Sequence, residues 1–262
     1  ISDKLDVASQ LQALVTSDEL ISSNTESAQL IYLAAQPDAN PIYETIIFNN
    51  RAEYKNSSVL IDKLTNANDP RLPFISKKNN AGIYIGNVPG VENISNYNGF
   101  SSPGTMYLAS TLPGVILSHA QVKFMLAEAA NRGFISGGQT AALNYYLEGI
   151  KANMEFNGVD NAVIDNYLNL PNINFTTAED GRNKIGEQNW IALYGQGIEA
   201  WTKWRRTGIP SLSPVQNAAI PSIPTRYYYP TYLVNINKDN YLNAVATLSG
   251  GDELTSPVWW MN

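Results

Sequence analysis

The 262-residue sequence contains no cysteine, so a disulfide, a cysteine-ligated zinc site and a thiol nucleophile are all excluded within it. It has a single histidine, His119, and no HExxH spacing, so the pattern predicts no metal site. No apolar run approaches the ~20 residues that a membrane-spanning helix needs. Residues 1–4 lack the basic start and apolar stretch of a signal peptide, and no Met precedes them. We therefore expect the start of the natural chain to be missing.

Positive charge is also scarce. The sequence has 17 basic and 23 acidic residues, for a net charge of −6, and its longest basic cluster is Arg205-Arg206. A nucleic-acid binder normally carries a cationic stripe that neutralises phosphates, so that class is disfavoured. The sequence contains no GxxxxGK[ST] or GxSxG motif. Gly195 and Gly197 lack the third glycine and the preceding strand of a dinucleotide fingerprint. We expect no cofactor.

Hydrophobic residues make up 44% of the chain, enough for a folded core. Their spacing predicts several helices. The expected helices cover residues 6–34, 57–65, 118–132, 140–156 and 178–206, with a short one at 235–248. Ser118 and Gln121 predict a capping box for one helix, and Thr177 with Asp180 predicts another. Gly195, inside the longest expected helix, indicates close packing or a kink. The expected core contains Leu126, Tyr146, Ile150, Leu193 and Trp201.

Residues 66–117 form a long segment without helical periodicity, rich in Asn, Gly, Pro and Ser. Segments of this kind are uncommon unless they carry function or small strands of their own. Single aromatic residues here lie beside side-chain amides, a composition expected of a sugar site, where rings stack on sugar C–H faces and amides bind hydroxyls. The candidate ligand-contacting residues are Tyr84, Tyr97, Phe100, Tyr107, Asn96 and Asn98, with Asn93 nearby. An equally open interpretation is that these rings pin the loop to the body.

Two alternatives come from other classes: a purely structural helical scaffold, which would need no concave polar-aromatic site, and an enzyme. A glycosidase needs only two carboxylates at a suitable separation, and 23 acidic residues do not exclude such a pair. Glu128, Glu148 and Glu199 nevertheless lie on expected helices, where ion pairing is their ordinary role. We expect no catalytic residue and no enzymatic activity.

Several segments together resemble the SusD/RagB family of Bacteroidetes outer-membrane lipoproteins. The matching segments are 68–73 (NDPRLP), 117–133 (LSHAQVKFMLAEAANRG), 145–154 (YYLEGIKANM), 188–194 (QNWIALY), 205–210 (RRTGIP), 223–230 (IPTRYYYP) and 258–260 (VWW). They cover almost the whole chain in the family's order. His119, Asn189 and Asn262 depart from the residues common in the family.

The resemblance implies a mainly α-helical, SusD-like fold with tetratricopeptide-like helix pairs, a loop-rich ligand face and few short strands. It implies that residues 1–262 are the C-terminal part of a single SusD-like domain. It also implies a cell-surface protein that binds glycans or oligosaccharides and delivers them to a SusC-type TonB-dependent porin. Attachment to the outer membrane would be through an N-terminal lipid outside this chain. A peptide-binding member of the family is the alternative, and a helical glycoside hydrolase is a more remote one.

Overall fold

The structure is a computed structural model that describes residues 6–90, 96–215 and 217–261. It is mainly helical with few short strands, which confirms the expected fold class. The strands are β1 (Ala28–Leu30) and β2 (Gly114–Leu117), which pair antiparallel with Gln29 opposite Val115. The helices of the described residues begin with α1 (Val7–Ser17), α2 (Pro41–Tyr43), α3 (Ser58–Asn66) and α4 (Leu72–Ile75).

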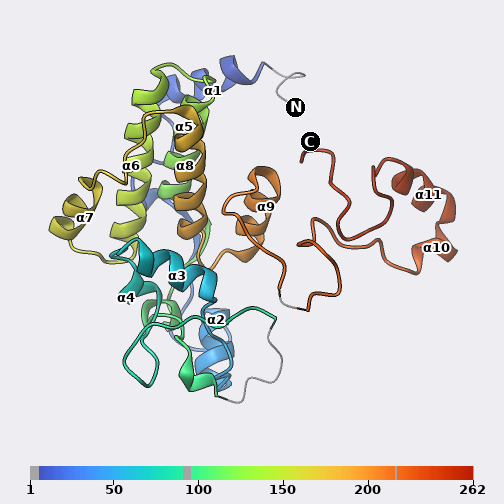
Figure 1. The fold of residues 1–262 in the computed structure, drawn as a ribbon, viewed down its shortest axis with the longest axis horizontal. Coiled ribbons are helices and arrows are strands. Elements are labelled where there is room, and N and C mark those ends of the chain that lie inside the picture. Colours follow the sequence, from blue (N-terminus) through green and yellow to red (C-terminus); the bar gives the residue numbers. More distant parts are fainter. Residues whose placement is uncertain (1–5, 91–95, 216, 262) are drawn as a thin grey trace.

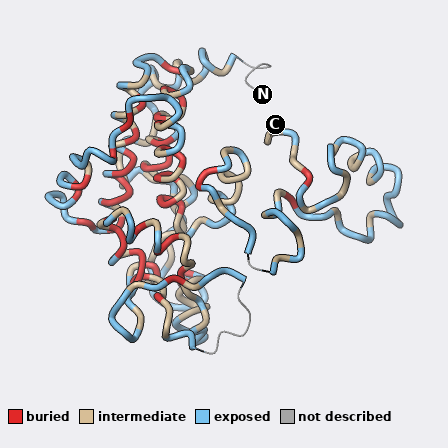
Figure 2. The backbone as a smooth tube through the Cα atoms, viewed as in Figure 1, coloured by how far each residue is buried: buried red, intermediate tan, exposed pale blue. Residues whose placement is uncertain are grey.

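Three long helices form the centre of the molecule: α5 (His119–Asn131), α6 (Gly138–Phe156) and α8 (Ala178–Ala192) (Figure 1). They pack on one another and carry most of the buried positions (Figure 2). The short helix α7 (Asn161–Leu168) adds to α6. Ser118 accepts a hydrogen bond from the Gln121 backbone while the Gln121 side chain accepts one from the Ser118 backbone, so the expected capping box is confirmed.

The α5–α6 contact depends on a glycine. A β-carbon at Gly149 would lie 2.9 Å from the Phe124 ring, closer than real contacts of this kind. Phe124 itself is completely buried, as are its core neighbours Tyr146 and Ile150. The absence of a side chain at Gly149 therefore lets the two helices approach closely, and it explains glycine in the middle of a helix despite its low helix propensity.

A buried ion pair joins the long loop to this helical centre. Arg71, which is 0% exposed, donates hydrogen bonds to both carboxylate oxygens of Asp69, at 2.9 and 2.6 Å. It also donates to Asn153 on α6 at 2.8 Å and to Gln188 on α8 at 2.6 Å. Tyr167 on α7 donates to Asp69. Arg71 thus links the loop to two helices and, through Asp69, to a third, and its four side-chain hydrogen bonds compensate for burial of the charge.

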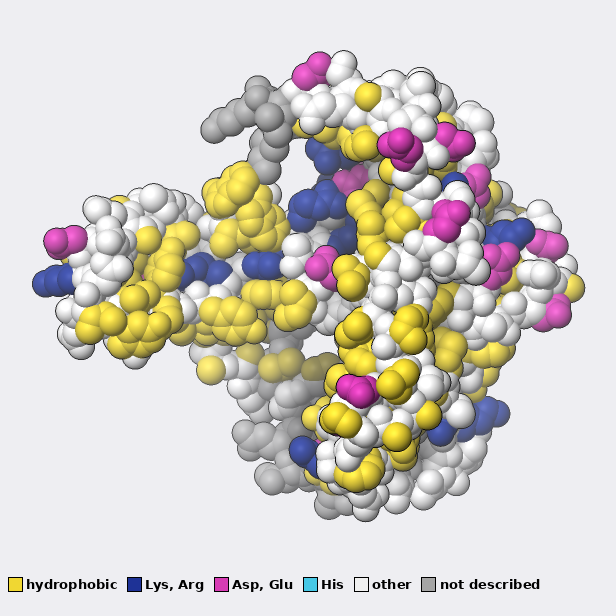
Figure 3. All heavy atoms as spheres, turned by 180° about the vertical axis from the view of Figure 1, so that it is seen from behind, with side chains coloured by type: hydrophobic (Ala, Val, Ile, Leu, Met, Phe, Trp, Pro, Cys, Tyr) yellow, Lys and Arg dark blue, Asp and Glu magenta, His cyan; other side chains and the backbone are white. Residues whose placement is uncertain are grey.

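The remainder of the chain is an arm of residues 197–261, with 216 outside the described residues. It contains α9 (Gly197–Thr207), which lies beside α8, and α10 (Leu233–Ile236) and α11 (Lys238–Ala246), which lie away from the three central helices (Figure 1). Many of its apolar side chains lie on the surface (Figure 3). The Arg205 guanidinium lies 3.7 Å from the Trp201 ring centre and 4.8 Å from that of Trp260, which ties α9 to the C-terminal segment.

The prediction of one helix over residues 178–206 was wrong. The chain instead forms α8 and α9, separated by a turn in which Gly195 has φ +88°. A right-handed helix requires negative φ, whereas glycine adopts the left-handed region without steric cost, so the helix ends before Gly195. The apolar period continues across this turn and therefore does not indicate the break. Because α9 turns away, Trp201 is only half-buried and lies outside the core, contrary to expectation. Tyr146, Ile150 and Leu193 are buried as expected, and Leu126 is half-buried against the core.

The prediction of a helix over residues 6–34 was wrong in its second part. Helix α1 ends at Ser17, and the next residue, Asp18, has a left-handed backbone. Residues 28–30 then pair with residues 114–117 as β1, which places Leu30 on the exposed side of the ribbon. Pairing with a segment far along the chain overrides the local helical spacing. The shorter helices expected at 57–65 and 235–248 correspond to α3 and to α11 with slightly different bounds.

Candidate saccharide-binding site

The long loop is held to the body by Asn56, which is buried immediately before α3. Its backbone N–H donates to Ser101, and its backbone carbonyl accepts from Asn87. Its side-chain amide donates to Ser76 at 2.9 Å and accepts from the Tyr194 hydroxyl at 2.6 Å. Because the backbone and side chain of one buried residue bind several loop segments at once, the segments around residues 85–87 and 101–102 have a fixed position on the helical body.

The four aromatic residues predicted to contact ligand lie in different environments. Tyr97 is 40% exposed at the start of a 3-10 turn, Tyr97–Gly99, and Phe100 directly after it is half-buried. Tyr84 is half-buried with the Lys78 ammonium 5.7 Å from its ring centre, and burial raises the pKa of the Tyr84 hydroxyl. These three rings belong to segments joined by backbone hydrogen bonds, such as the one from Ser101 to Ile85.

Tyr107 differs from the other three because only 5% of it is exposed. Its ring packs edge-on against Tyr194 with centroids 4.6 Å apart, and its hydroxyl donates to Asn157 at 2.9 Å. Burial strongly raises the pKa of the hydroxyl, so it remains protonated at any physiological pH. Tyr107 therefore serves the fold, as the second interpretation of the loop aromatics expected, although one edge of it lines the cavity described below.

The predicted amide residues lie on the surface beside Tyr97. Asn96 and Asn98 are both exposed. Their backbone carbonyls accept hydrogen bonds from Gly99 and Asn80, respectively, while their side-chain amides make no hydrogen bond to a described residue. Asn93 lies outside the described residues. The structure thus brings Tyr97, Phe100, Asn96 and Asn98 together on one exposed turn, which we call the aromatic loop.

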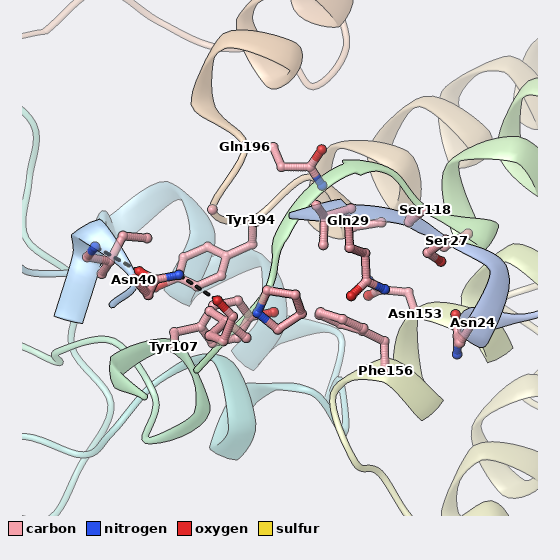
Figure 4. Close-up of a pocket in the computed structure, with 18 of the residues that line it drawn as sticks. Asn24, Ser27, Gln29, Asn40, Tyr107, Ser118, Asn153, Phe156, Tyr194 and Gln196 are labelled. Atoms are coloured by element: carbon pink, nitrogen blue, oxygen red, sulfur yellow. Dashed lines mark hydrogen bonds between the residues drawn. The ribbon is translucent and has the colours of Figure 1, made fainter. Parts of the chain in front are cut away.

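A separate cavity of about 260 Å³ lies between the ribbon β1–β2, α2 and the ends of α6 and α8. Figure 4 shows its two ends. Tyr107, Tyr194 and Asn40 lie at one end, and Gln29 reaches toward Asn153 and Phe156 at the other. Sequence reasoning missed this cavity because its lining comes from segments spread over more than half the chain. Gln29, in particular, lies in the segment that we expected to be helical, and a helical pattern does not predict that its side chain faces this cavity.

The charged groups of the described residues do not form an obvious reactive centre. No group of three or more His, Asp or Glu residues that could hold a metal ion occurs among them. The lining of the cavity, and that of a second, shallower hollow beside Trp190, contains no Asp or Glu. Both ring nitrogens of His119 are buried without a hydrogen-bond partner among the described residues, and burial lowers the pKa of this imidazole. No described helix is both long and apolar enough to cross a membrane.

Comparison with solved structures shows close structural similarity. A chitin-binding protein shares 28% identity with a TM-score of 0.81, covering 97% of this chain and 59% of that chain. A SusD homologue from Bacteroides fragilis NCTC 9343 shares 26% identity with a TM-score of 0.84, covering 97% and 61%. A SusD homologue from Bacteroides thetaiotaomicron VPI-5482 shares 25% identity with a TM-score of 0.76, covering 97% and 61%.

The chain spans about three fifths of the length of these solved relatives. The comparison with curated proteins returned no match. A family profile described as SusD-like, starch-binding and associating with the outer membrane matches residues 1–230. The match includes the long loop, the three central helices and α9, so it covers both the body and the aromatic loop. The chain therefore belongs to this SusD-like family.

Proposed function

We propose that this chain binds a glycan or oligosaccharide at the aromatic loop and holds it without cleaving it. The observation that carries the proposal is the exposed turn where Tyr97 and Phe100 stand beside the side-chain amides of Asn96 and Asn98, which make no hydrogen bond to a described residue. Membership of a family described as starch-binding supports a saccharide ligand. The similarity to a chitin-binding protein at 28% identity adds to that support.

Binding at this loop would depend on a rigidly held surface and on several weak contacts with the ligand. The aromatic loop rests on the Asn56 network, which in turn is anchored to α3 and to the end of α8. A binding surface held in place in this way loses little conformational entropy when a ligand arrives. By analogy with aromatic pairs, each ring that stacks on a sugar contributes about 1 kcal/mol, so affinity depends on several such contacts.

Hydrolysis of the saccharide is the competing activity, and the residues that line the cavity disfavour it. A glycosidase places two carboxylates about 5–10 Å apart on either side of the bond that it cleaves. The cavity and the hollow beside Trp190, both formed by described residues, have no Asp or Glu in their lining. Glu128 is held by Lys203 and Arg206 in an ion-pair network and has no free role as a general acid.

In the cell, the proposed role is capture at the outer surface. The chain, as part of a longer lipid-anchored protein on the outer membrane, would deliver its ligand to a SusC-type TonB-dependent transporter. The family description as associating with the outer membrane supports this location. A peptide ligand is the alternative within the same family, and a mixed screen of glycans and peptides separates the two.

The test is a glycan-array screen followed by calorimetric titration of the best oligosaccharide. Tyr97→Ala should weaken binding about fivefold, the equivalent of ~1 kcal/mol, with an unchanged thermal midpoint. Tyr232→Ala is the matched control, because Tyr232 is also an exposed tyrosine and directly precedes α10 on the arm, away from the aromatic loop (Figure 1). Absence of any glycan binding, or equal losses in the two variants, would refute the proposal.

A further inference from the structure

The ribbon that walls the cavity places one polar side chain among apolar ones on its inward face. Side chains alternate along a strand, and the inward positions are normally apolar. In β1, however, Gln29 points into the cavity while Leu30 is 55% exposed. In β2, Ile116 is 69% exposed, and Val115, the partner of Gln29, lines the cavity. The ribbon therefore places an amide where an ordinary core would have an aliphatic side chain.

Several polar atoms around the cavity have no partner among the described residues. Oε1 of Gln196 is buried without one, whereas the half-buried Gln29 side chain makes no hydrogen bond to a described residue and is open to the cavity. Asn153 uses its oxygen to accept from Arg71, which leaves its amide nitrogen available. A buried polar group without a hydrogen bond costs about 1–3 kcal/mol, so the Gln196 oxygen favours a hydrogen-bond donor in the cavity, and the Gln29 and Asn153 amides lie where they can bind the same group. Other lining groups, such as Asn40, are already engaged with the backbone.

The chemistry of the lining selects an uncharged partner. None of the described residues that line the cavity is Asp, Glu, Lys, Arg or His. An ionised group entering it would lose hydration without gaining a counter-charge, and that loss costs several kcal/mol. The amides supply both donors and acceptors, which match hydroxyl and acetamido groups, and the rings of Phe156 and Tyr32 supply apolar surface. At about 260 Å³, the cavity is slightly smaller than pockets for drug-sized ligands, which span ~300–1,000 Å³.

Building on the saccharide-binding function proposed above, we propose that this cavity is a second subsite that takes one uncharged sugar unit. The amides of Gln29, Gln196 and Asn153 bind the sugar's hydroxyl or acetamido groups. The subsite is separate from the aromatic loop, because Tyr107 and Tyr194 stand between the cavity and the Asn56 network that carries the loop. It would discriminate against uronic-acid or sulfated units, whereas an exposed stacking surface alone would not.

The experiment is protein-observed NMR of the purified chain with ¹⁵N labelling. The probes are N-acetylglucosamine trisaccharide, maltotriose and trigalacturonate. Gln29→Leu and Gln196→Leu identify the two side-chain amide signals by their disappearance. We expect at least one neutral trisaccharide to shift both signals and trigalacturonate to shift neither. Gln29→Leu should weaken binding of that neutral trisaccharide about fivefold, which is within the range for one lost hydrogen bond. Gln29→Trp, which fills the cavity, should weaken it further.

The possible outcomes distinguish a failure of the proposed cavity subsite from a failure of the proposed saccharide-binding function. If the saccharides shift only signals of the aromatic loop, the saccharide-binding function stands and the subsite is refuted, with ordered water as the partner of the cavity amides. Equal shifts with trigalacturonate would refute the selection for uncharged units. If no probe shifts any signal, both proposals fail. Thermal midpoints of the Gln29 variants identify any loss of folding, and the amide shifts in the wild-type chain remain decisive if a variant fails to fold.

Discussion

Replacing Arg71 with Met tests how the loop is fixed to the helical body. The substitution keeps most of the side chain's volume and removes the guanidinium, which leaves the Asp69 carboxylate, 3% exposed, without its cation. It also removes the donors to Asn153 and Gln188. Breaking a buried pair by removing one partner costs about 3–5 kcal/mol. We expect the free energy of unfolding to fall by that amount.

Urea denaturation monitored by circular dichroism measures this loss at neutral pH. Arg132→Met is the matched control, because Arg132 is also an arginine in an ion pair but lies at the surface directly after α5, so its loss should cost less than ~1 kcal/mol. The double variant Asp69→Asn with Arg71→Met removes both charges and should recover much of the stability lost by Arg71→Met alone. A loss below 1 kcal/mol in Arg71→Met would show that the network does not stabilise the fold, and the reasoning would be refuted.

Two further predictions concern packing and pH. Gly149→Ala should lower the free energy of unfolding by about 1–3 kcal/mol, because the added methyl meets the buried Phe124 ring. Gly197→Ala is the control and should lower it little, because the space around Gly197 is open. Equal effects of the two variants in urea denaturation would contradict the close-packing argument. Burial alone would raise the pKa of Glu128, but the paired hydrogen bonds from Arg206 lower it from 4.5 to about 2. A carboxyl group whose pKa is lower in the folded than in the unfolded protein stabilises the folded state at pH values above 4.5. Its contribution to the free energy of unfolding, at most about 3 kcal/mol, is lost as the pH falls toward 2. Glu128→Gln should flatten this acid dependence in a pH series of unfolding measurements, and an unchanged slope would show that another group causes it.

The parts of the fold that sequence analysis predicted well depend on local signals. The capping box at Ser118 and the glycine after α5 act within a few residues, so the start and end of that helix were readable. The break at Gly195 was not, because the apolar period continues across it and only the left-handed backbone reveals the turn. The exposure of Trp201 follows from that turn, so one unseen backbone angle explains both errors.

The candidate site shows the same division. Exposure of Tyr97 and Asn96 follows from their place in a polar turn, which the sequence displays. Burial of Tyr107 depends on Tyr194 and Asn157, which come from distant helices, so its environment was not predictable from its neighbours. Gln29 faces the cavity only because β1 pairs with β2, a contact between segments more than 80 residues apart. Long-range pairing of this kind leaves no periodic signal in the sequence.

The central claim is that the chain captures a saccharide and leaves it intact. The most direct measurement incubates the purified chain with the best oligosaccharide from the array, separates the complex from free sugar, and weighs the bound ligand by mass spectrometry. The account predicts that ligand of unchanged mass is recovered from the complex, even after prolonged incubation, and that less is recovered from Tyr97→Ala. Shortened products that disappear when an acidic pair is mutated, or no ligand in the complex at all, would contradict it.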